Sequence, residues 1–443
     1  MSNPLVLLHG YSSNGEAFSI WKNALLAAGR KVEEISVGNY VTLNNEVTVD
    51  DIANGFHRAL HDKGLDKVPF DAMVHSTGML VLRSWLTASN TQTPRQGLLK
   101  HLVALAPATF GSGLAAKGRS LLGRIFMGNR RIGPDFLDSG NLVLSNLELG
   151  SAYTWNLAHK DLIDTKLYGV GNDTPYVFVF DGTNDYGKLA EIFLPGDQKG
   201  SDGVVRWSGV ALNTRKITLN LGKPSVDWSE WSSDLLDIPL IPVVGLNHGQ
   251  ILSQPPQELI DLVLKALNVN SGDDFKKFHA TDVANAQVVQ QARAKLQNNR
   301  WQQFVVHATD SHENPITDYS IEIILKEADG TETEVANFES DVHPYAADTS
   351  YRCFHVQLDN LPPLGGKRLI ARVIASTGTE LVGYQGFGSK AAVPDFGPFD
   401  LDLSDYDGTK PGKPALFYPF TTTLLEIILN REPRPPIKIF QWL

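Results

Sequence analysis

A serine between an apolar strand pattern and an apolar helix pattern is the feature of this sequence that points most directly to chemistry. The segment Met73–Met79 reads Met-Val-His-Ser-Thr-Gly-Met, with an apolar run at 70–74 before Ser76. A serine at a sharp strand-to-helix turn holds its hydroxyl above the sheet, at a helix N-terminus that stabilises negative charge. Such a turn requires small neighbours; Gly78 meets this requirement and Val74 does not. Ser76 is therefore a candidate nucleophile, with an N-capping serine as the alternative.

A serine hydroxyl becomes a nucleophile when a histidine takes its proton, and a carboxylate usually orients that histidine. Among the 12 histidines, His248 is the best candidate, because it follows the last strong apolar run in a glycine-flanked loop. Two aspartates are candidates for the carboxylate that orients the histidine. Asp185 follows an apolar strand pattern, and Asp202 lies in the turn Ser-Asp-Gly-Val-Val. Each can also be a simple turn-forming residue, so the residues alone leave both open.

Two backbone N–H groups are candidates for stabilising a reaction intermediate. The tetrahedral intermediate of acyl transfer carries an oxyanion that requires two preorganised donors. The chain opens with an apolar strand pattern that ends in His9-Gly10-Tyr11. We expect the N–H groups of Tyr11 and Thr77 to form this oxyanion hole. A plain strand-to-loop turn is the alternative for His9-Gly10.

Together these features resemble the α/β-hydrolase family, and within it the lipases and esterases. The resemblance rests on four motifs: His9-Gly10, the elbow at 75–78, the turn at 201–205 and Asn-His-Gly at 247–249. The order Ser76, Asp202, His248 matches the chain order of the family. Bacterial lipases of this fold often place their acid in an Asp-Gly-hydrophobic-Val turn, which favours Asp202 over Asp185. Val74 departs from the glycine usual in the family.

The resemblance implies carboxylic ester hydrolysis through an acyl-enzyme, without cofactor or metal. Ser76 would attack the ester, His248 would shuttle the proton, and Asp202 would orient the imidazole. An acyl lipid is the expected type of substrate. Two alternatives stay open: an acyltransferase, which shares the acyl-enzyme, and a non-catalytic member of the fold that binds lipid or protein.

The elements that must position these residues alternate between short apolar runs and helical patterns through residues 1–272, which is typical of a parallel sheet covered by helices. We expect strands at 5–8, 31–36, 70–75, 101–106, 176–180, 217–221 and 241–244. We expect helices at 16–28, 48–64, 77–88 and 256–267. Residues 273–300 predict a connecting helix, and the strand and turn signals of 301–443 predict an accessory β-sandwich domain.

Residues 109–167 interrupt the alternation where lipases of this fold carry a lid. Within them Gly111–Gly128 combines large apolar residues with Lys117, Arg119 and Arg124. This composition suits a lid that contacts a lipid interface, and it equally suits a cap packed permanently over the site.

Six aromatic residues of the second domain have two interpretations, filling of its core or a surface for lipid aggregates. They are Phe396, Phe399, Tyr406, Phe417, Tyr418 and Phe420.

Composition excludes several classes of protein. The net charge of −10 disfavours a protein that wraps duplex nucleic acid, and no apolar run is long enough to span a bilayer. A single cysteine, Cys353, excludes an intrachain disulfide and a multi-cysteine zinc site. The metal motifs are absent; Asp400-Leu-Asp402 begins like a calcium loop but lacks its glycine and glutamate. No secretory signal is recognised, so we expect a cytoplasmic protein or the mature form of a secreted one.

Overall fold

The chain divides into two compact units, which are described here from a computed structural model. Unit 1 consists of Met1–Thr214 and Trp231–Asn298, and unit 2 of Arg215–Glu230 and Asn299–Leu443. The structure describes residues 3–8, 18–35, 47–88, 95–117, 141–165, 167–170, 174–187, 199–223, 227–228, 238–335, 338–387, 394–406 and 415–434.

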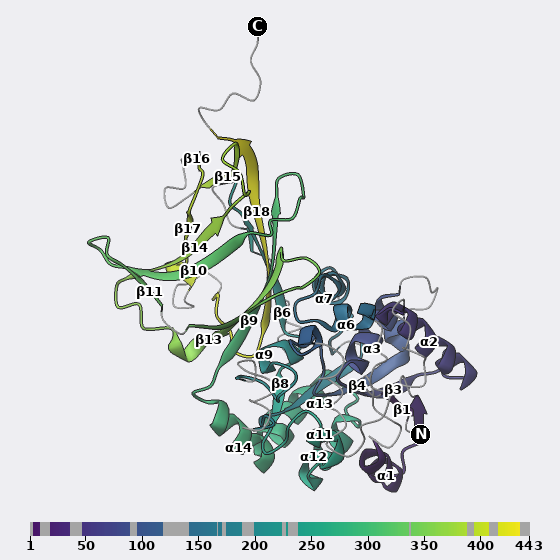
Figure 1. Cartoon of the computed structure of the whole chain (residues 1–443). Coiled ribbons are helices and arrows are strands. Elements are labelled where there is room, and N and C mark those ends of the chain that lie inside the picture. The colour runs from purple at the N-terminus through teal and green to yellow at the C-terminus, as the bar shows by residue number, and fades with distance from the viewer. Residues whose placement is uncertain are drawn as a thin grey trace. The chain divides into compact units, whose positions relative to one another are not determined.

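Unit 1 is built on a parallel sheet of six strands in the order β2-β1-β3-β4-β5-β8. Figure 1 labels β1, β3, β4 and β8 of this sheet. The strands are β1 (Leu5–Leu8), β2 (Val32–Ile35), β3 (Phe70–His75), β4 (Leu99–Leu105), β5 (Tyr176–Gly182) and β8 (Leu240–Val243). The inner strands are apolar runs because they are buried on both faces; every residue of β1 and β3 is buried. The predicted α/β domain with a mostly parallel sheet is confirmed.

The helices of unit 1 are α1 (Ser19–Ala27), α2 (Val49–Asp62), α3 (Gly78–Thr87), α4 (Arg95–Leu98), α6 (Asn141–Leu147), α7 (Ala152–Ala158), α9 (Trp207–Val210), α11 (Gln250–Ser253), α12 (Gln257–Ala266), α13 (Gly272–Lys277) and α14 (Gln287–Leu296), with the further helical turns η1 (Ala115–Lys117), η4 (His159–Ile163) and η5 (Phe278–Val283). Helices α1, α2, α3 and α12 begin and end near the expected positions. Helix α2 shows why a helix begins where it does. The Thr48 hydroxyl accepts the N–H of Asp51 at 3.1 Å, and the Asp51 carboxylate accepts the N–H of Thr48 at 2.9 Å. This capping box satisfies first-turn donors. No helix in the described residues is long and apolar enough to cross a membrane.

The prediction that residues 273–300 form a helix connecting the two domains is wrong. The segment forms α13, η5 and α14, which all lie in unit 1. Phe275, Phe278 and Val289 are buried among the core side chains of that unit. The helical spacing reflected an apolar face that packs against the sheet domain.

The strand expected at 217–221 exists but belongs to unit 2. It is β6 (Thr214–Asn220), which pairs with β7 (Asp227–Trp228) and with β18. Its inward residues Ile217 and Leu219 join the core of unit 2. The structure therefore removes residues 215–230 from the predicted catalytic domain 1–272.

Unit 2 contains two β-sheets, which confirms the predicted C-terminal all-β domain. One has the order β11-β10-β14-β17, and the other has the order β12-β13-β9-β18-β15-β16 with β6 and β7 beside it (Figure 1). The strands are β9 (Trp301–Asp310), β10 (Tyr319–Lys326), β11 (Glu332–Glu334), β12 (Glu339–Pro344), β13 (Tyr351–Gln357), β14 (Arg368–Ala375), β15 (Val382–Phe387), β16 (Pro394–Asp395), β17 (Phe399–Asp402) and β18 (Thr422–Pro433). Strands β9 and β18 pair in parallel, whereas the four-stranded sheet is antiparallel throughout.

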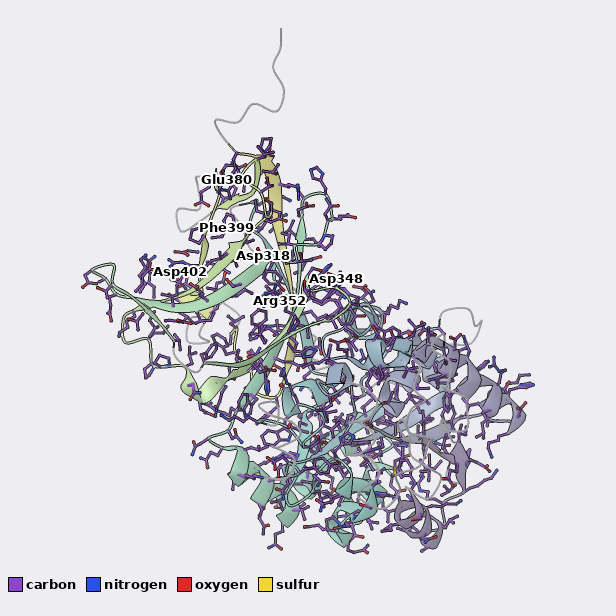
Figure 2. The ribbon with its side chains drawn as sticks, viewed as in Figure 1. Asp318, Asp348, Arg352, Glu380, Phe399 and Asp402 are labelled. Atoms are coloured by element: carbon purple, nitrogen blue, oxygen red, sulfur yellow. The ribbon has the colours of Figure 1, made fainter. Side chains whose placement is uncertain are left out.

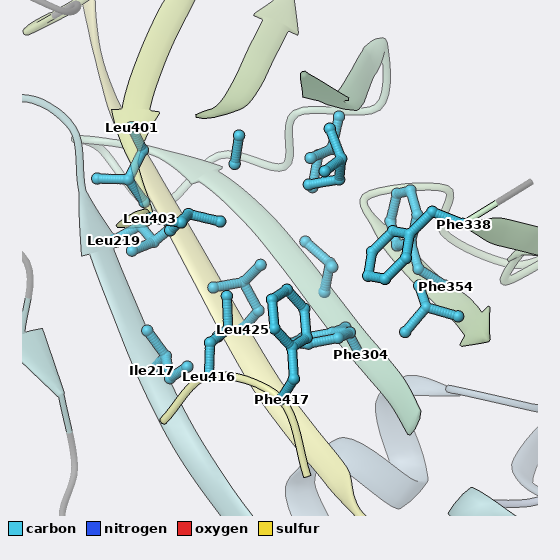
Figure 3. Close-up of a pocket in the computed structure, with 15 residues that line it drawn as sticks. Ile217, Leu219, Phe304, Phe338, Phe354, Leu401, Leu403, Leu416, Phe417 and Leu425 are labelled. Atoms are coloured by element: carbon cyan, nitrogen blue, oxygen red, sulfur yellow. The ribbon is translucent and has the colours of Figure 1, made fainter. Parts of the chain in front are cut away.

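The core of unit 2 contains three of the six aromatic residues singled out in the sequence. Phe399 is buried, and Tyr406 and Phe417 pack against the same core. Figure 2 shows Phe399 together with surface acids of this unit, among them Glu380 and Asp402. The core includes a cavity of about 80 Å³ that is lined only by apolar side chains (Figure 3). Core filling is thus the interpretation that fits these three aromatic residues.

A buried ion pair joins helix α3 to the inserted region of unit 1. The Arg83 guanidinium donates to both carboxylate oxygens of Asp161, at 2.7 and 2.8 Å, and both side chains are fully buried. The Tyr168 hydroxyl donates to the same carboxylate at 2.8 Å. Because two charges are removed from water here, each depends on the other for its stabilisation.

We predict that Arg83→Met lowers the free energy of unfolding by about 3–5 kcal/mol, because it leaves the Asp161 carboxylate buried without its cation. Chemical denaturation followed by circular dichroism measures this change. Lys22→Met is the matched control, since Lys22 forms a half-exposed pair with Glu34 at 3.0 Å and its loss should cost less than about 1 kcal/mol. Equal losses in the two variants would contradict the prediction.

Candidate active site

Ser76 lies in the sharp turn between β3 and α3. Its φ is 54°, a left-handed conformation that non-glycine residues rarely adopt. The turn is fixed by its neighbours: Ser76 N–H donates to the Leu105 carbonyl at 3.3 Å, and the Ser76 carbonyl accepts the N–H of Ala108 at 3.1 Å. Such strain costs about 1–3 kcal/mol and persists where the surrounding structure enforces it.

Val74 does not prevent this turn from forming. The residue is fully buried in β3, in register with Leu8 of β1 and Ala104 of β4. Its side chain is part of the packed sheet. The fold therefore accommodates valine at position 74, where the family usually has glycine.

His248 and Asp202 form a close, fully buried contact. The Nδ1 atom of His248 lies 2.7 Å from Oδ2 of Asp202, and neither side chain is exposed to solvent. The backbone adds a second link, since the His248 N–H donates to the Asp202 carbonyl at 3.1 Å. A carboxylate accepts hydrogen bonds, so it places the imidazole proton on Nδ1.

The turn that carries Asp202 is shaped by its own side chain. Oδ1 of Asp202 accepts the N–H groups of Val204 and Val205, each at 2.8 Å. Gly203 has a φ of 96°, and a Cβ there would lie 2.5 Å from the ring of Tyr186. The Asp-Gly-Val-Val sequence thus supplies a carboxylate, a left-handed position and two donors in succession.

Tyr186 packs against this turn at Gly203, a contact that the sequence did not predict. Its hydroxyl accepts the N–H of Gly249, next to His248, at 3.2 Å. Burial and the neighbouring Asp202 charge raise the pKa of Tyr186, so it stays a neutral phenol. The residue therefore connects the loop of the acid with the loop of the histidine.

The backbone of Asp185, the alternative acid, lies close to Gly203, but its side chain makes a different contact. Its side chain is exposed, and its Oδ1 accepts the N–H of Gly187 at 2.8 Å, two positions along the chain. This is the local hydrogen bond of a turn-forming aspartate. Between the two candidates, the structure brings Asp202 to His248.

His75, next to Ser76, also contacts His248. Its Nε2–H donates to the His248 carbonyl at 3.0 Å, and the centroids of the two imidazole rings lie 4.7 Å apart. This contact ties the turn after β3 to the loop after β8. The sequence carried no signal for it beyond the position of His75 beside the serine.

Of the two expected oxyanion donors, the structure describes one. Thr77 directly precedes α3, at the helix N-terminus, and is buried. First-turn N–H groups lack helical partners and carry partial positive charge. Tyr11 lies outside the described residues.

The inserted region 109–167 is described at residues 109–117, 141–165 and 167. The Ser112 hydroxyl donates to the Val204 carbonyl at 2.6 Å, and the Thr109 hydroxyl donates to the Val210 carbonyl at 2.6 Å. The start of the insertion is thus bound to the segment that carries Asp202. Most of the predicted lid Gly111–Gly128 lies outside the described residues.

The described residues contain no cluster of three or more histidine, cysteine, aspartate or glutamate side chains arranged to hold a metal ion.

Comparison with known proteins finds similarity among solved structures. No protein-family model matches the sequence, and no curated protein matches it. Phospholipase PlaB from Legionella pneumophila has a TM-score of 0.76 and 22% identity, covering 100% of this chain and 97% of PlaB. PlaB in complex with thio-NAD gives a TM-score of 0.74 and 22% identity, with coverages of 99% and 96%. The two chains therefore share their fold over nearly their whole length.

We predict that Asp202→Asn lowers kcat for a soluble p-nitrophenyl ester by about 10³- to 10⁴-fold, because an amide no longer fixes the imidazole tautomer. Asp185→Asn is the control, and its kcat should stay close to wild type. Circular dichroism checks that both variants fold. A collapse of kcat in the Asp185 variant, with Asp202→Asn active, would reverse the assignment.

Proposed function

Because the chain has the α/β-hydrolase fold, we propose that this protein is a serine ester hydrolase of the lipase and carboxylesterase type. The single observation that carries the proposal is the buried contact of 2.7 Å between His248 and Asp202. His75, the residue before Ser76, contacts His248, and Ser76 itself is held at φ 54° between β3 and α3. A left-handed serine at this turn and a histidine–carboxylate pair are what an acyl-transfer site requires.

The first half of the reaction forms an acyl-enzyme. The Oγ atom of Ser76 attacks the ester carbonyl carbon while its proton passes to Nε2 of His248. Asp202 stabilises the imidazolium through Nδ1–H. The tetrahedral intermediate then collapses, the bond to the alcohol breaks, and His248 gives its proton to the leaving alcohol.

The second half regenerates the serine. A water molecule transfers its proton to His248 and attacks the acyl carbon, and the Ser76–acyl bond breaks as Ser76 takes the proton back. In both halves the oxyanion is stabilised by the N–H groups of Thr77 and Tyr11. The position of Thr77 at the N-terminus of α3 supports its part.

The substrate we propose is an ester of an acyl lipid. Similarity to a phospholipase over nearly the whole chain supports a lipid substrate for this chain as well. The apolar and basic composition of Gly111–Gly128 suits a lid that contacts the lipid.

Ser76→Ala tests the nucleophile. We predict a loss of several orders of magnitude in kcat for p-nitrophenyl butyrate, because alanine has no hydroxyl with which to form the acyl-enzyme. Ser84→Ala is the matched control on the same helix: its hydroxyl donates to Asp50 at 2.6 Å, and its removal should leave kcat nearly unchanged. Full activity of Ser76→Ala would exclude the proposed mechanism.

A series of p-nitrophenyl esters with acyl chains of increasing length tests the substrate class. For an enzyme that acts on acyl lipids, kcat/KM should rise with chain length, since each additional methylene buries apolar surface. Fatty acid release from phosphatidylcholine vesicles should also depend on Ser76. Turnover confined to the acetate ester, with no release from vesicles, would contradict a lipid substrate.

A further inference from the structure

A second buried carboxyl lies beside the proposed triad. Asp181 is the penultimate residue of β5 and has no solvent exposure. Its Oδ1 accepts the N–H of Gly182 at 2.8 Å. Among the residues that the structure describes, no donor reaches its Oδ2. The Asp202 side chain lies within hydrogen-bonding reach of this carboxyl.

Close contacts connect the end of β5 with the loop after β8 and with the segment after Asp202. The end of β5 and the loop after β8 are joined by the N–H of Asn184, which donates to the Leu246 carbonyl at 2.9 Å. The approach is close, since a Cβ on Gly182 would lie 2.2 Å from the Leu246 carbonyl oxygen. The Trp207 indole binds the segment after Asp202 to β5, donating to the Gly182 carbonyl at 2.9 Å. The neighbouring acids are therefore a fixed feature of the fold.

Two adjacent buried carboxyls cannot both carry a charge at neutral pH. Their hydrogen bonds decide where the proton resides. Asp202 accepts from Val204, Val205 and His248, whereas Asp181 accepts from Gly182. Three donors contact Asp202 and one contacts Asp181, so the proton of the pair belongs to Asp181.

The charged and titratable groups around Asp181 agree with this placement. Asp202 faces it directly, and Asp202 in turn contacts His248 and lies near Tyr186. Lys295 of α14 is a cation near the end of β5, where it donates to the Thr183 carbonyl and to Oδ1 of Asn184. Burial and the Asp202 carboxylate raise the pKa of Asp181 well above its ordinary value.

We propose that Asp181 is a positioning residue that stays protonated and donates a hydrogen bond to the Asp202 carboxylate, which holds that carboxylate against His248. The effect on turnover rests on the proposed function. The protonation of Asp181 does not, because it follows from burial and from the neighbouring carboxylate.

Asparagine mimics a protonated aspartate, because its amide can donate to Asp202 and still accept from Gly182. Asp181→Asn should therefore keep kcat and KM close to wild type. Asp181→Leu has similar size and no donor, so kcat should fall about 10- to 100-fold, the loss expected for a hydrogen bond to a charged group. KM should not change, because Asp181 acts through Asp202.

The pH dependence of stability tests protonation without any assay of activity. A raised pKa in the folded state contributes stability that is fully present below the ordinary value of 3.8, and this stability is lost as pH rises toward the folded-state pKa. Asparagine does not titrate, so the variant does not lose this stability as pH rises. The Tm of Asp181→Asn relative to wild type should therefore rise between pH 4 and pH 8. Asp185→Asn is the control and should not reproduce the trend, because that carboxyl is exposed to water.

Two results would overturn the proposal. One is a fall of kcat in Asp181→Asn as large as in Asp181→Leu, which would mean that the negative charge of Asp181 is what matters. The other is a Tm difference between Asp181→Asn and wild type that does not increase with pH. If Asp181→Leu fails to fold, two measurements on Asp181→Asn still test the proposal: a kcat more than about 10-fold below wild type, or a Tm difference that does not increase with pH, would overturn it. If Ser76→Ala shows that the proposed function is wrong, the Tm measurement still tests the protonation of Asp181.

Discussion

The burial of the Asp202 carboxylate is the constraint on which the site depends. A charge without solvent contact is tolerated in a protein only when hydrogen bonds replace the lost hydration. Here two backbone N–H groups and the His248 imidazole do so. Those donors are in place only if the turn at 202–205 and the loop at 248 keep their shapes. Gly203 and Tyr186 make these shapes possible, so the electrostatic requirement of one side chain fixes the geometry of two loops.

The parallel sheet explains why residues so distant in sequence meet. Ser76 follows β3, Asp181 is near the end of β5, and His248 follows β8, all at the carboxyl edge of one sheet. Parallel strands carry their following loops to the same edge, which is where open α/β sheets bind ligands. The rigid strands also hold Ser76 in a left-handed conformation that a free loop would relax.

Much of this arrangement could be predicted from residue types and chain order, and the rest required three-dimensional contacts. The positions of β1, β3 and β5 could be predicted from their apolar runs, because strands buried on both faces lack polar alternation. The choice between Asp185 and Asp202 could not be derived from the local sequence, since both residues lie in segments typical of turns. Strand β6 was assigned to the wrong unit although its buried residues alternate along the strand, the pattern of a half-buried antiparallel strand. Asp181 could not be singled out from the sequence, because it directly follows the apolar run of β5 and precedes a glycine, as a turn-forming aspartate does.

The central claim is that Ser76 is activated as a nucleophile by His248 and Asp202. Labelling of the full chain with a fluorophosphonate, followed by peptide mass spectrometry, tests this claim most directly, because the reagent phosphonylates activated serines and leaves ordinary hydroxyls unmodified. The account predicts one adduct, on the peptide that contains Ser76, and its loss in Asp202→Asn. An adduct on a different serine, or continued ester hydrolysis by a protein that remains unlabelled, would contradict it.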